Sequence, residues 1–151
     1  MDQTKHHQPI DKEVLIERAR HNRELGQIGE RLAINYLVAN GFKLLDHNWK
    51  SKHRYEIDIV AERDGYLHIV EVKTRTSDTF IDPIAAIGHD KLIYLSKAAS
   101  LYKRWYNYTF PVVIDGITIV YKDAYHYKLQ FYPELHNRLL DDAFVRYGRN
   151  R

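Results

Sequence analysis

The dipeptide Asp64-Gly65 lies between two segments that each suit a β-strand, and it limits the folds open to this chain more than any other feature. Asp-Gly favours the two-residue turn that joins neighbouring antiparallel strands. The flanking segments, residues 55–61 and 66–75, are rich in β-branched and aromatic residues and alternate apolar with polar positions. The sequence therefore predicts a β-hairpin centred on this turn.

A two-residue turn at this position fixes which residues of the two strands face each other. Asp58 then faces Glu71, and Glu56 faces Lys73. Because side chains alternate between the two faces of a strand, these four share one face. The opposite face carries the apolar residues of the same strands: Ile57, Ile59, Val70 and Val72. We expect the apolar face to join the core and the polar face to form a site.

The paired carboxylates of Asp58 and Glu71 need a compensating positive charge. Cβ atoms of directly opposed residues are ~4.5–5.5 Å apart, and like charges in that arrangement destabilise a sheet. Either a divalent cation or a nearby ammonium group such as that of Lys73 would offset the repulsion. Two carboxylates, a backbone carbonyl and water suit Mg²⁺ or Mn²⁺. The absence of cysteine excludes a zinc site built on thiolates, and the nine histidines show no metal-ligand spacing.

The remaining segments predict helices and strands that alternate along the chain. Before the hairpin come a charged, helix-permissive stretch at 11–23, an amphipathic helix at 25–40, a strand at 42–45 and a polar connection at 46–54. After it come a loop at 76–88 and a helix at 90–106, which is capped by Asp90 and has Tyr106 on its buried stripe. The chain ends with strands at 110–120 (interrupted at Asp115-Gly116) and 125–131, and with a short helix and a frayed tail at 133–151. This order predicts an α/β (α+β) protein with a mixed central sheet flanked by helices.

Composition places the chain among ordinary globular proteins. Its 151 residues are 44% hydrophobic and 28% charged, which is enough for one domain with a sizeable core. No apolar run approaches the ~18–20 residues that span a bilayer, and the start of the chain is polar. We therefore expect a cytoplasmic protein with no membrane partner. The net charge of +3 is only mildly basic, so affinity for nucleic acid depends on where the charges lie.

A third acid, Glu30, lies beside the apolar stripe of the first predicted helix. At 100° per residue it falls on a shoulder formed by Gly26, Ala33 and Leu37. Small residues on this shoulder allow close approach to a neighbouring element. We therefore consider Glu30 a candidate ligand, either directly or through water, for a metal at the hairpin.

Basic residues are concentrated near the proposed acids. Lys50, Lys52 and Arg54 lie in the connection before the hairpin, and Arg75 follows the proposed site. Positive charge beside such a site would contact phosphates without reading sequence, and the alternative for the connection alone is a solvated charged loop. Four aromatic residues are candidates for stacking on unpaired bases: Trp49, Tyr55, Phe80 and Trp105.

Four motifs occur in a specific order between about residues 22 and 120: Gly26-x-x-Gly29-Glu30, Asn48-Trp49, Glu56-Ile57-Asp58-Ile59-Val60 and Val70-Glu71-Val72-Lys73. This order resembles the YraN-like family of bacterial proteins. That family is grouped with the PD-(D/E)xK, restriction-endonuclease-like nucleases and is similar in motif order to archaeal Holliday-junction resolvases. Two positions depart from the family pattern: Tyr55 replaces a usual glycine, and Asp115 lacks the arginine that often precedes it.

The resemblance implies a restriction-endonuclease-like three-layer fold and a phosphodiester hydrolase. Residues 22–132 would form the nuclease-like domain, with a helical extension at 1–21 and a tail at 133–151. Asp58, Glu71 and the carbonyl of Val72 would hold Mg²⁺ (or Mn²⁺), Lys73 would lie beside the attacking water, and Glu30 would be the helix acid. Lys91, at the start of the second long helix, is a further candidate for the same cleft.

Three functions remain open from the sequence. The first is an endonuclease acting on DNA, including branched or junction DNA, for which a resolvase-like role would require two sites and hence a homodimer. The second is a nucleic-acid-binding accessory module that keeps the nuclease fold without turnover. The third is a structural or protein-interaction domain, which would bind neither metal nor nucleic acid.

Overall fold

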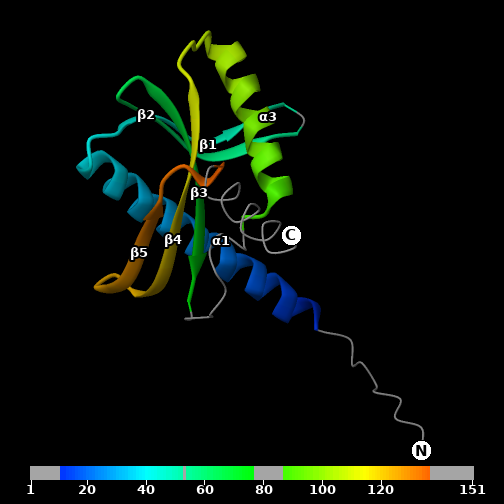
Figure 1. The fold of residues 1–151 in the computed structure, drawn as a ribbon. Coiled ribbons are helices and arrows are strands. Elements are labelled where there is room, and N and C mark those ends of the chain that lie inside the picture. Colours follow the sequence, from blue (N-terminus) through cyan, green and yellow to red (C-terminus); the bar gives the residue numbers. More distant parts are fainter. Residues whose placement is uncertain (1–10, 53, 77–86, 137–151) are drawn as a thin grey trace, which may run out of the picture.

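The computed structural model describes residues 11–52, 54–76 and 87–136, and it shows a sheet between two helices (Figure 1). The helices are α1 (Lys12–Ala39) and α3 (His89–Tyr106). Five strands form the sheet in the order of the chain: β1 (Lys43–Lys50), β2 (Glu56–Arg63), β3 (Tyr66–Arg75), β4 (Val112–Asp123) and β5 (His126–Tyr132). Strands β3 and β4 are parallel and the other pairs are antiparallel. The predicted three-layer α/β fold with a mixed sheet is confirmed.

The hairpin forms at the predicted turn with the predicted register. Asp64 and Gly65 have φ angles of 51° and 79°, so both turn residues adopt the positive φ that a tight hairpin turn requires. The paired residues run from Arg63 opposite Tyr66 to Ile59 opposite Val70. Local turn chemistry therefore sets the register of the two strands that carry the acids.

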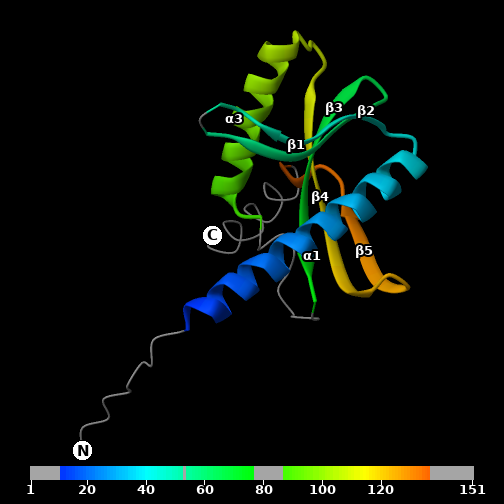
Figure 2. The same cartoon turned by 180° about the vertical axis from the view of Figure 1, so that it is seen from behind.

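Helix α1 is a continuous helix of 28 residues that covers one face of the sheet. The side chain of Asp11 accepts a hydrogen bond from the Glu13 amide at 3.0 Å and caps its first turn. Only Gly29, Ala33 and Leu37 are buried, so the first half of the helix extends past the sheet (Figure 2). Residue 22, where the sequence suggested that the domain begins, lies inside this helix.

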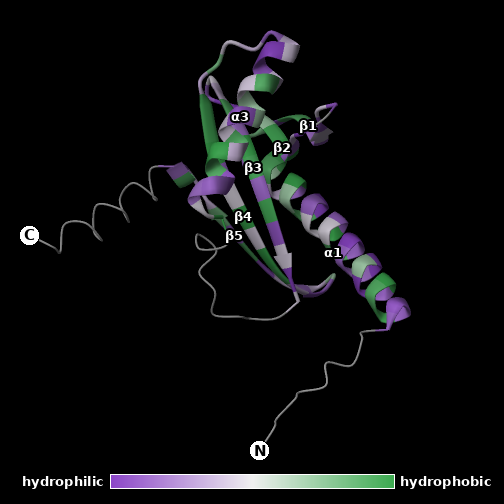
Figure 3. Ribbon diagram, turned by 90° about the vertical axis from the view of Figure 1, so that its right-hand side faces the viewer, coloured by the Kyte–Doolittle hydropathy of each residue, from purple (hydrophilic) through white to green (hydrophobic). Residues whose placement is uncertain are grey.

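Each face of the sheet carries its own core. Under α1, Ala33 and Leu37 pack on Ile59, Val70 and neighbouring residues. Under α3, a second cluster joins the helix to the other side of the same strands, and its members include Trp49, Ile57, Val60, Leu67, Ile69, Leu92, Leu95, Ala99 and Tyr102. In Figure 3 the strands between the helices are mostly hydrophobic, with hydrophilic residues interrupting β3.

Two expectations about the hairpin faces are therefore wrong. The face that carries Glu71 is also a core face, because α3 covers it and buries Val60 and Ile69 there. Ile57 packs with Trp49 under α3 and not beside Ile59 under α1. The alternation of side chains breaks between these two isoleucines, at Asp58.

Several element boundaries also differ from the sequence prediction. Strand β1 continues to Lys50, because β2 pairs with it along its length. Strand β4 runs through Asp115-Gly116 without interruption. Gly88, not Asp90, precedes the first residue of α3, and Tyr106 is exposed. Leu135, assigned to the tail, is buried in the core under α3.

The expected turn of helix within 76–88, the candidate Phe80 and the frayed tail beyond residue 136 lie outside the described residues. Across the described part of the chain, neither helix combines the length and the apolar character needed to cross a bilayer.

Candidate functional site

Asp58 lies where strand pairing is interrupted on both sides of β2. The paired residues of β2 and β3 end at Ile59 opposite Val70, so Asp58, the preceding residue in the chain, is not paired with β3. The ladder with β1 pairs the residues before and after Asp58 but omits Asp58 itself, whose neighbour Asn48 has a φ of 49°. Asp58 Oδ2 instead accepts a hydrogen bond from the Val72 amide at 2.9 Å. A carboxylate thus replaces a backbone acceptor at this point of the sheet.

This geometry corrects the predicted facing pairs. Asp58 does not form a ladder pair with Glu71, but its bond to Val72 holds it beside Glu71. Glu56 does not face Lys73. Its carboxylate is 3.5 Å from Lys50 Nζ across the pairing of β1 and β2, because β2 and β3 are no longer paired there.

The surroundings of Asp58 favour its protonated form. Burial raises the pKa of Asp58 to about 6, and the negative charge of Glu71 contributes in the same direction. The Val72 amide and the ammonium groups of Lys91 and Lys73 lower the pKa but do not cancel these effects. A shifted carboxyl group next to a second carboxylate is typical of functional sites.

Glu71 is a buried carboxylate held by two ammonium groups. Its side chain is 6% exposed, and Glu71 Oε1 is 3.4 Å from Lys73 Nζ and 3.5 Å from Lys91 Nζ. Lys73 follows Glu71 on β3, whereas Lys91 comes from the first turn of α3. Lys91 therefore reaches the acids as expected, and its ion pair with Glu71 joins the helix layer to the sheet.

Helix α1 brings Glu30 to the same region. Burial raises the pKa of Glu30, the side-chain hydrogen bond from Asn48 lowers it, and the charge of Asp58 raises it further. The helix can approach β3 closely because Gly29 has no side chain. A Cβ atom at this position would overlap the side chain of Thr74. Gly29, more than Gly26, thus provides the close approach that the small residues predicted.

The oxygen donors at this site suit Mg²⁺ or Mn²⁺. The partly buried Asp58 and the buried Glu71 supply two carboxylates, and burial disfavours the ionised form of Asp58. The N–H and C=O of a strand residue face the same neighbouring strand, so the Val72 carbonyl is on the Asp58 side. No group of three or more acidic or histidine ligands occurs in the described residues. Water would complete the shell, which Mg²⁺ tolerates well.

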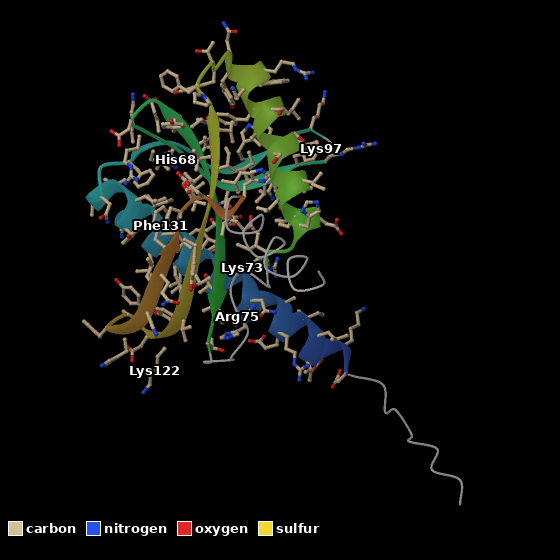
Figure 4. The ribbon with its side chains drawn as sticks, viewed as in Figure 1. His68, Lys73, Arg75, Lys97, Lys122 and Phe131 are labelled. Carbon is tan, nitrogen blue, oxygen red and sulfur yellow. The ribbon has the colours of Figure 1, made fainter. Side chains whose placement is uncertain are left out.

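The predicted phosphate-binding residues divide into three places. Lys91 lies at the acids. Lys50, Lys52 and Arg54 line a groove at the end of β1, and the charge of Lys50 also acts on Glu30. Arg75 lies further along β3 than Lys73 (Figure 4).

Tyr94 was missed by the sequence reading, although it connects these places. The Glu56 amide donates to its hydroxyl at 2.7 Å, and that hydroxyl donates to the Arg54 carbonyl at 3.2 Å. Lys91 Nζ lies 4.6 Å from the centre of its ring. Its only sequence signal is its position one helical turn after Lys91, which also describes many ordinary core residues.

A second buried polar pair was also missed. His68 Nδ1 and Asp115 Oδ2 are 2.6 Å apart, and Asp115 Oδ1 accepts from the Glu134 amide at 2.9 Å. Asp115 is fully buried. Its role in this structure is to bind β3 and the segment after β5 to β4.

Comparison with known proteins gives a consistent family. The family described as "Uncharacterised protein family UPF0102" matches residues 29–119, a range that contains Glu30, Asp58, Glu71 and Lys73. A UPF0102 protein of Bacteroides thetaiotaomicron is 38% identical over 121 residues, covering 78% of this chain and 98% of its own. One from Syntrophomonas wolfei is 41% identical over 104 residues, covering 68% and 90%. The chain therefore belongs to the UPF0102, or YraN-like, family.

Proposed function

We propose that the protein is a Mg²⁺-dependent endonuclease that hydrolyses DNA phosphodiester bonds in the cytoplasm. One observation carries the proposal: the partly buried Asp58 lies beside the buried Glu71 and near Lys73, at a break in the sheet, where burial and then the charge of Glu71 raise the pKa of Asp58 to about 6. A chain gains no stability from two acids placed together away from water. A divalent cation bound by both would remove that repulsion.

The residues of the site have distinct roles in this proposal. Asp58, Glu71 and the Val72 carbonyl would hold the ion. When bound, Mg²⁺ offsets negative charge on the phosphate in the transition state and lowers the pKa of coordinated water. Lys73, whose Nζ is 3.4 Å from Glu71 Oε1, would orient the attacking water, and Glu30 would accept a hydrogen bond from an outer water.

A second candidate is a binding module that holds DNA without cutting it. The observation in its favour is that Lys73 and Lys91 already compensate the charge of Glu71. An ion would have to compete with two ammonium groups for that carboxylate. The same basic surroundings would still attract a polyanion.

A cleavage assay separates the two candidates. The protein is incubated with Mg²⁺ or Mn²⁺ and labelled linear, flapped and four-way DNA, beside Asp58→Ala and the control Glu17→Ala. Glu17 lies in the first half of α1, its side chain is 68% exposed, and it pairs with Arg20. Loss of a metal ligand should slow cutting by at least about a hundredfold, while the control cuts normally.

Each outcome of this assay has a definite meaning. Binding of every substrate without metal-dependent cutting would establish the accessory module. Cutting that survives in Asp58→Ala would exclude this site. If four-way DNA is the preferred substrate, paired cuts require two sites, and light scattering of the complex should show a homodimer.

A further inference from the structure

A basic groove with exposed aromatic rings lies at the end of β1, outside the acid site itself. Its volume is about 740 Å³, and it runs between the end of β1 and the last turn of α3. Its cationic residues are Lys50, Lys52 and Arg54, and its exposed or partly exposed rings are Tyr55, Trp105 and Tyr106. We call it the Trp105 groove.

The rings of this groove are unusually open to solvent. Trp105 is 73% exposed and Tyr106 is 46% exposed. Beneath them, Trp49 is buried and meets Tyr102 edge to face, with ring centres 5.4 Å apart. The fold is thus already anchored by the inner tryptophan. An outer tryptophan left in water points to a ligand with a flat apolar face.

The charge of the groove indicates what else that ligand carries. Among the residues that the structure describes, three cationic side chains line it and no acidic one does, although the carboxylate of Glu56 lies 3.5 Å from Lys50 Nζ. Lysines and arginine select a polyanion, and open rings select flat bases that are not already stacked in a duplex. Single-stranded DNA has both properties, whereas duplex DNA offers phosphates but hides the faces of its bases.

The groove continues toward the acids. Lys50 and Tyr55 also line a second hollow of about 430 Å³, together with Glu56 and Tyr94. The ring of Tyr94 contacts Lys91, whose ammonium group is 3.5 Å from Glu71. A strand lying in the groove would therefore lead along Tyr94 to the carboxylates.

We propose that the Trp105 groove binds single-stranded DNA, with Trp105 stacking on a base and Lys50, Lys52 and Arg54 contacting the backbone. This inference rests on the proposed nuclease function, and it specifies the substrate: DNA with an unpaired segment beside the scissile bond. A flap or a fork has such a segment, whereas a blunt duplex does not.

Binding can be measured separately from cutting. Asp58→Ala protein, which retains the groove, is titrated with a labelled 20-nucleotide DNA strand, the same sequence as blunt duplex, and the same sequence as RNA. Trp105→Ala in that background removes the stacking ring. Tyr125→Ala is the matched control, since Tyr125 is 91% exposed and lies in the turn between β4 and β5, away from the groove.

The expected result is selective. The single DNA strand should bind more tightly than the duplex and quench tryptophan fluorescence. Trp105→Ala should weaken single-strand binding about fivefold or more, because stacking on an aromatic ring is worth about 1–3 kcal/mol per base. Duplex affinity and the Tyr125→Ala control should not change.

Three other results would overturn the inference. These are equal affinity for strand and duplex, no loss in Trp105→Ala, or a stronger preference for the RNA strand. Each leaves the nuclease proposal standing if wild-type protein still cuts DNA. Conversely, selective strand binding by a wild-type protein that cuts nothing removes the nuclease proposal and keeps the groove.

Discussion

Asp115 is a fully buried aspartate and Asp58 a partly buried one, both beside β3, and their carboxylates have opposite surroundings. Asp115 is satisfied on both oxygens, by His68 at 2.6 Å and by the Glu134 amide at 2.9 Å. Asp58 accepts a hydrogen bond from the Val72 amide, and burial together with the neighbouring charge of Glu71 raises its pKa to about 6. An acid with a full set of internal partners supports the fold. An acid left beside a second carboxylate is where we propose that an external cation binds.

The largest expected effect removes the satisfied acid. Asp115→Ala leaves His68 and the Glu134 amide without their buried acceptor, and breaking such a pair costs about 3–5 kcal/mol of the free energy of unfolding. Urea unfolding followed by circular dichroism measures it. In the exposed pair, Asp123 is 2.8 Å from His126 and also accepts the Tyr125 and His126 amides, so Asp123→Ala should lose some stability but much less than Asp115→Ala. Equal stability of both variants would end the comparison.

At Asp58, by contrast, removal of the charge should raise the free energy of unfolding. Because the pKa of Asp58 is raised from 3.8 to about 6 on folding, its contribution to stability is complete below pH 3.8 and is lost as pH rises through 6. Asp58→Asn keeps an acceptor for Val72 without the charge. It should be more stable than wild type at pH 8, by up to about 3 kcal/mol, with no difference near pH 3.5. Lower stability at pH 8 would contradict this prediction.

The close approach of α1 to β3 brings Glu30 to the site by packing and not by charge. Its effect on stability can therefore be compared with those of the two aspartates. Gly29→Ala should cost about 1–3 kcal/mol, because the added methyl group overlaps Thr74 in a packed interface. Gly26→Ala is the matched control, with nothing within 4 Å of the new methyl group. It should raise stability by about 0.5–1 kcal/mol, as expected for alanine in a helix. Thermal unfolding of both variants gives the answer.

The smallest effect tests the external cation directly. Mn²⁺ at ten times its dissociation constant should stabilise wild type by about 1.4 kcal/mol, because a ligand of the folded state alone shifts the unfolding equilibrium. The shift should vanish in Asp58→Asn and weaken below pH 6, where protons compete for the carboxylate. It should persist in Gly26→Ala. An equal shift in Asp58→Asn would place the ion elsewhere.

What the sequence could predict was set by local chemistry. The Asp64-Gly65 turn determines the register of β2 and β3, and this was enough to bring Asp58 close to Glu71. Helical spacing placed Glu30 and Lys91 on faces that reach the cleft. In both cases the residues that decide the prediction are close together in the sequence, within one hairpin or one helix.

What the sequence could not predict depends on distant partners. The parallel pairing of β3 with β4 brings Asp115 to His68, 47 residues away, and no local pattern specifies it. The break in pairing at Asp58 arises because its own side chain takes the Val72 amide, which alternation cannot foresee. The second core face exists because α3 packs on that side of the sheet, and the spacing within β2 and β3 alone does not specify this contact.

The hydrogen bond from Val72 to Asp58 has a practical consequence. An amide that donates to a titrating carboxylate has a resonance whose position follows the charge on that oxygen. In a nitrogen–proton correlation spectrum, Val72 should therefore move with an inflection near the pKa of Asp58 and move again when an ion binds. The backbone of β3 would thus act as an internal indicator, readable in solution without any DNA present.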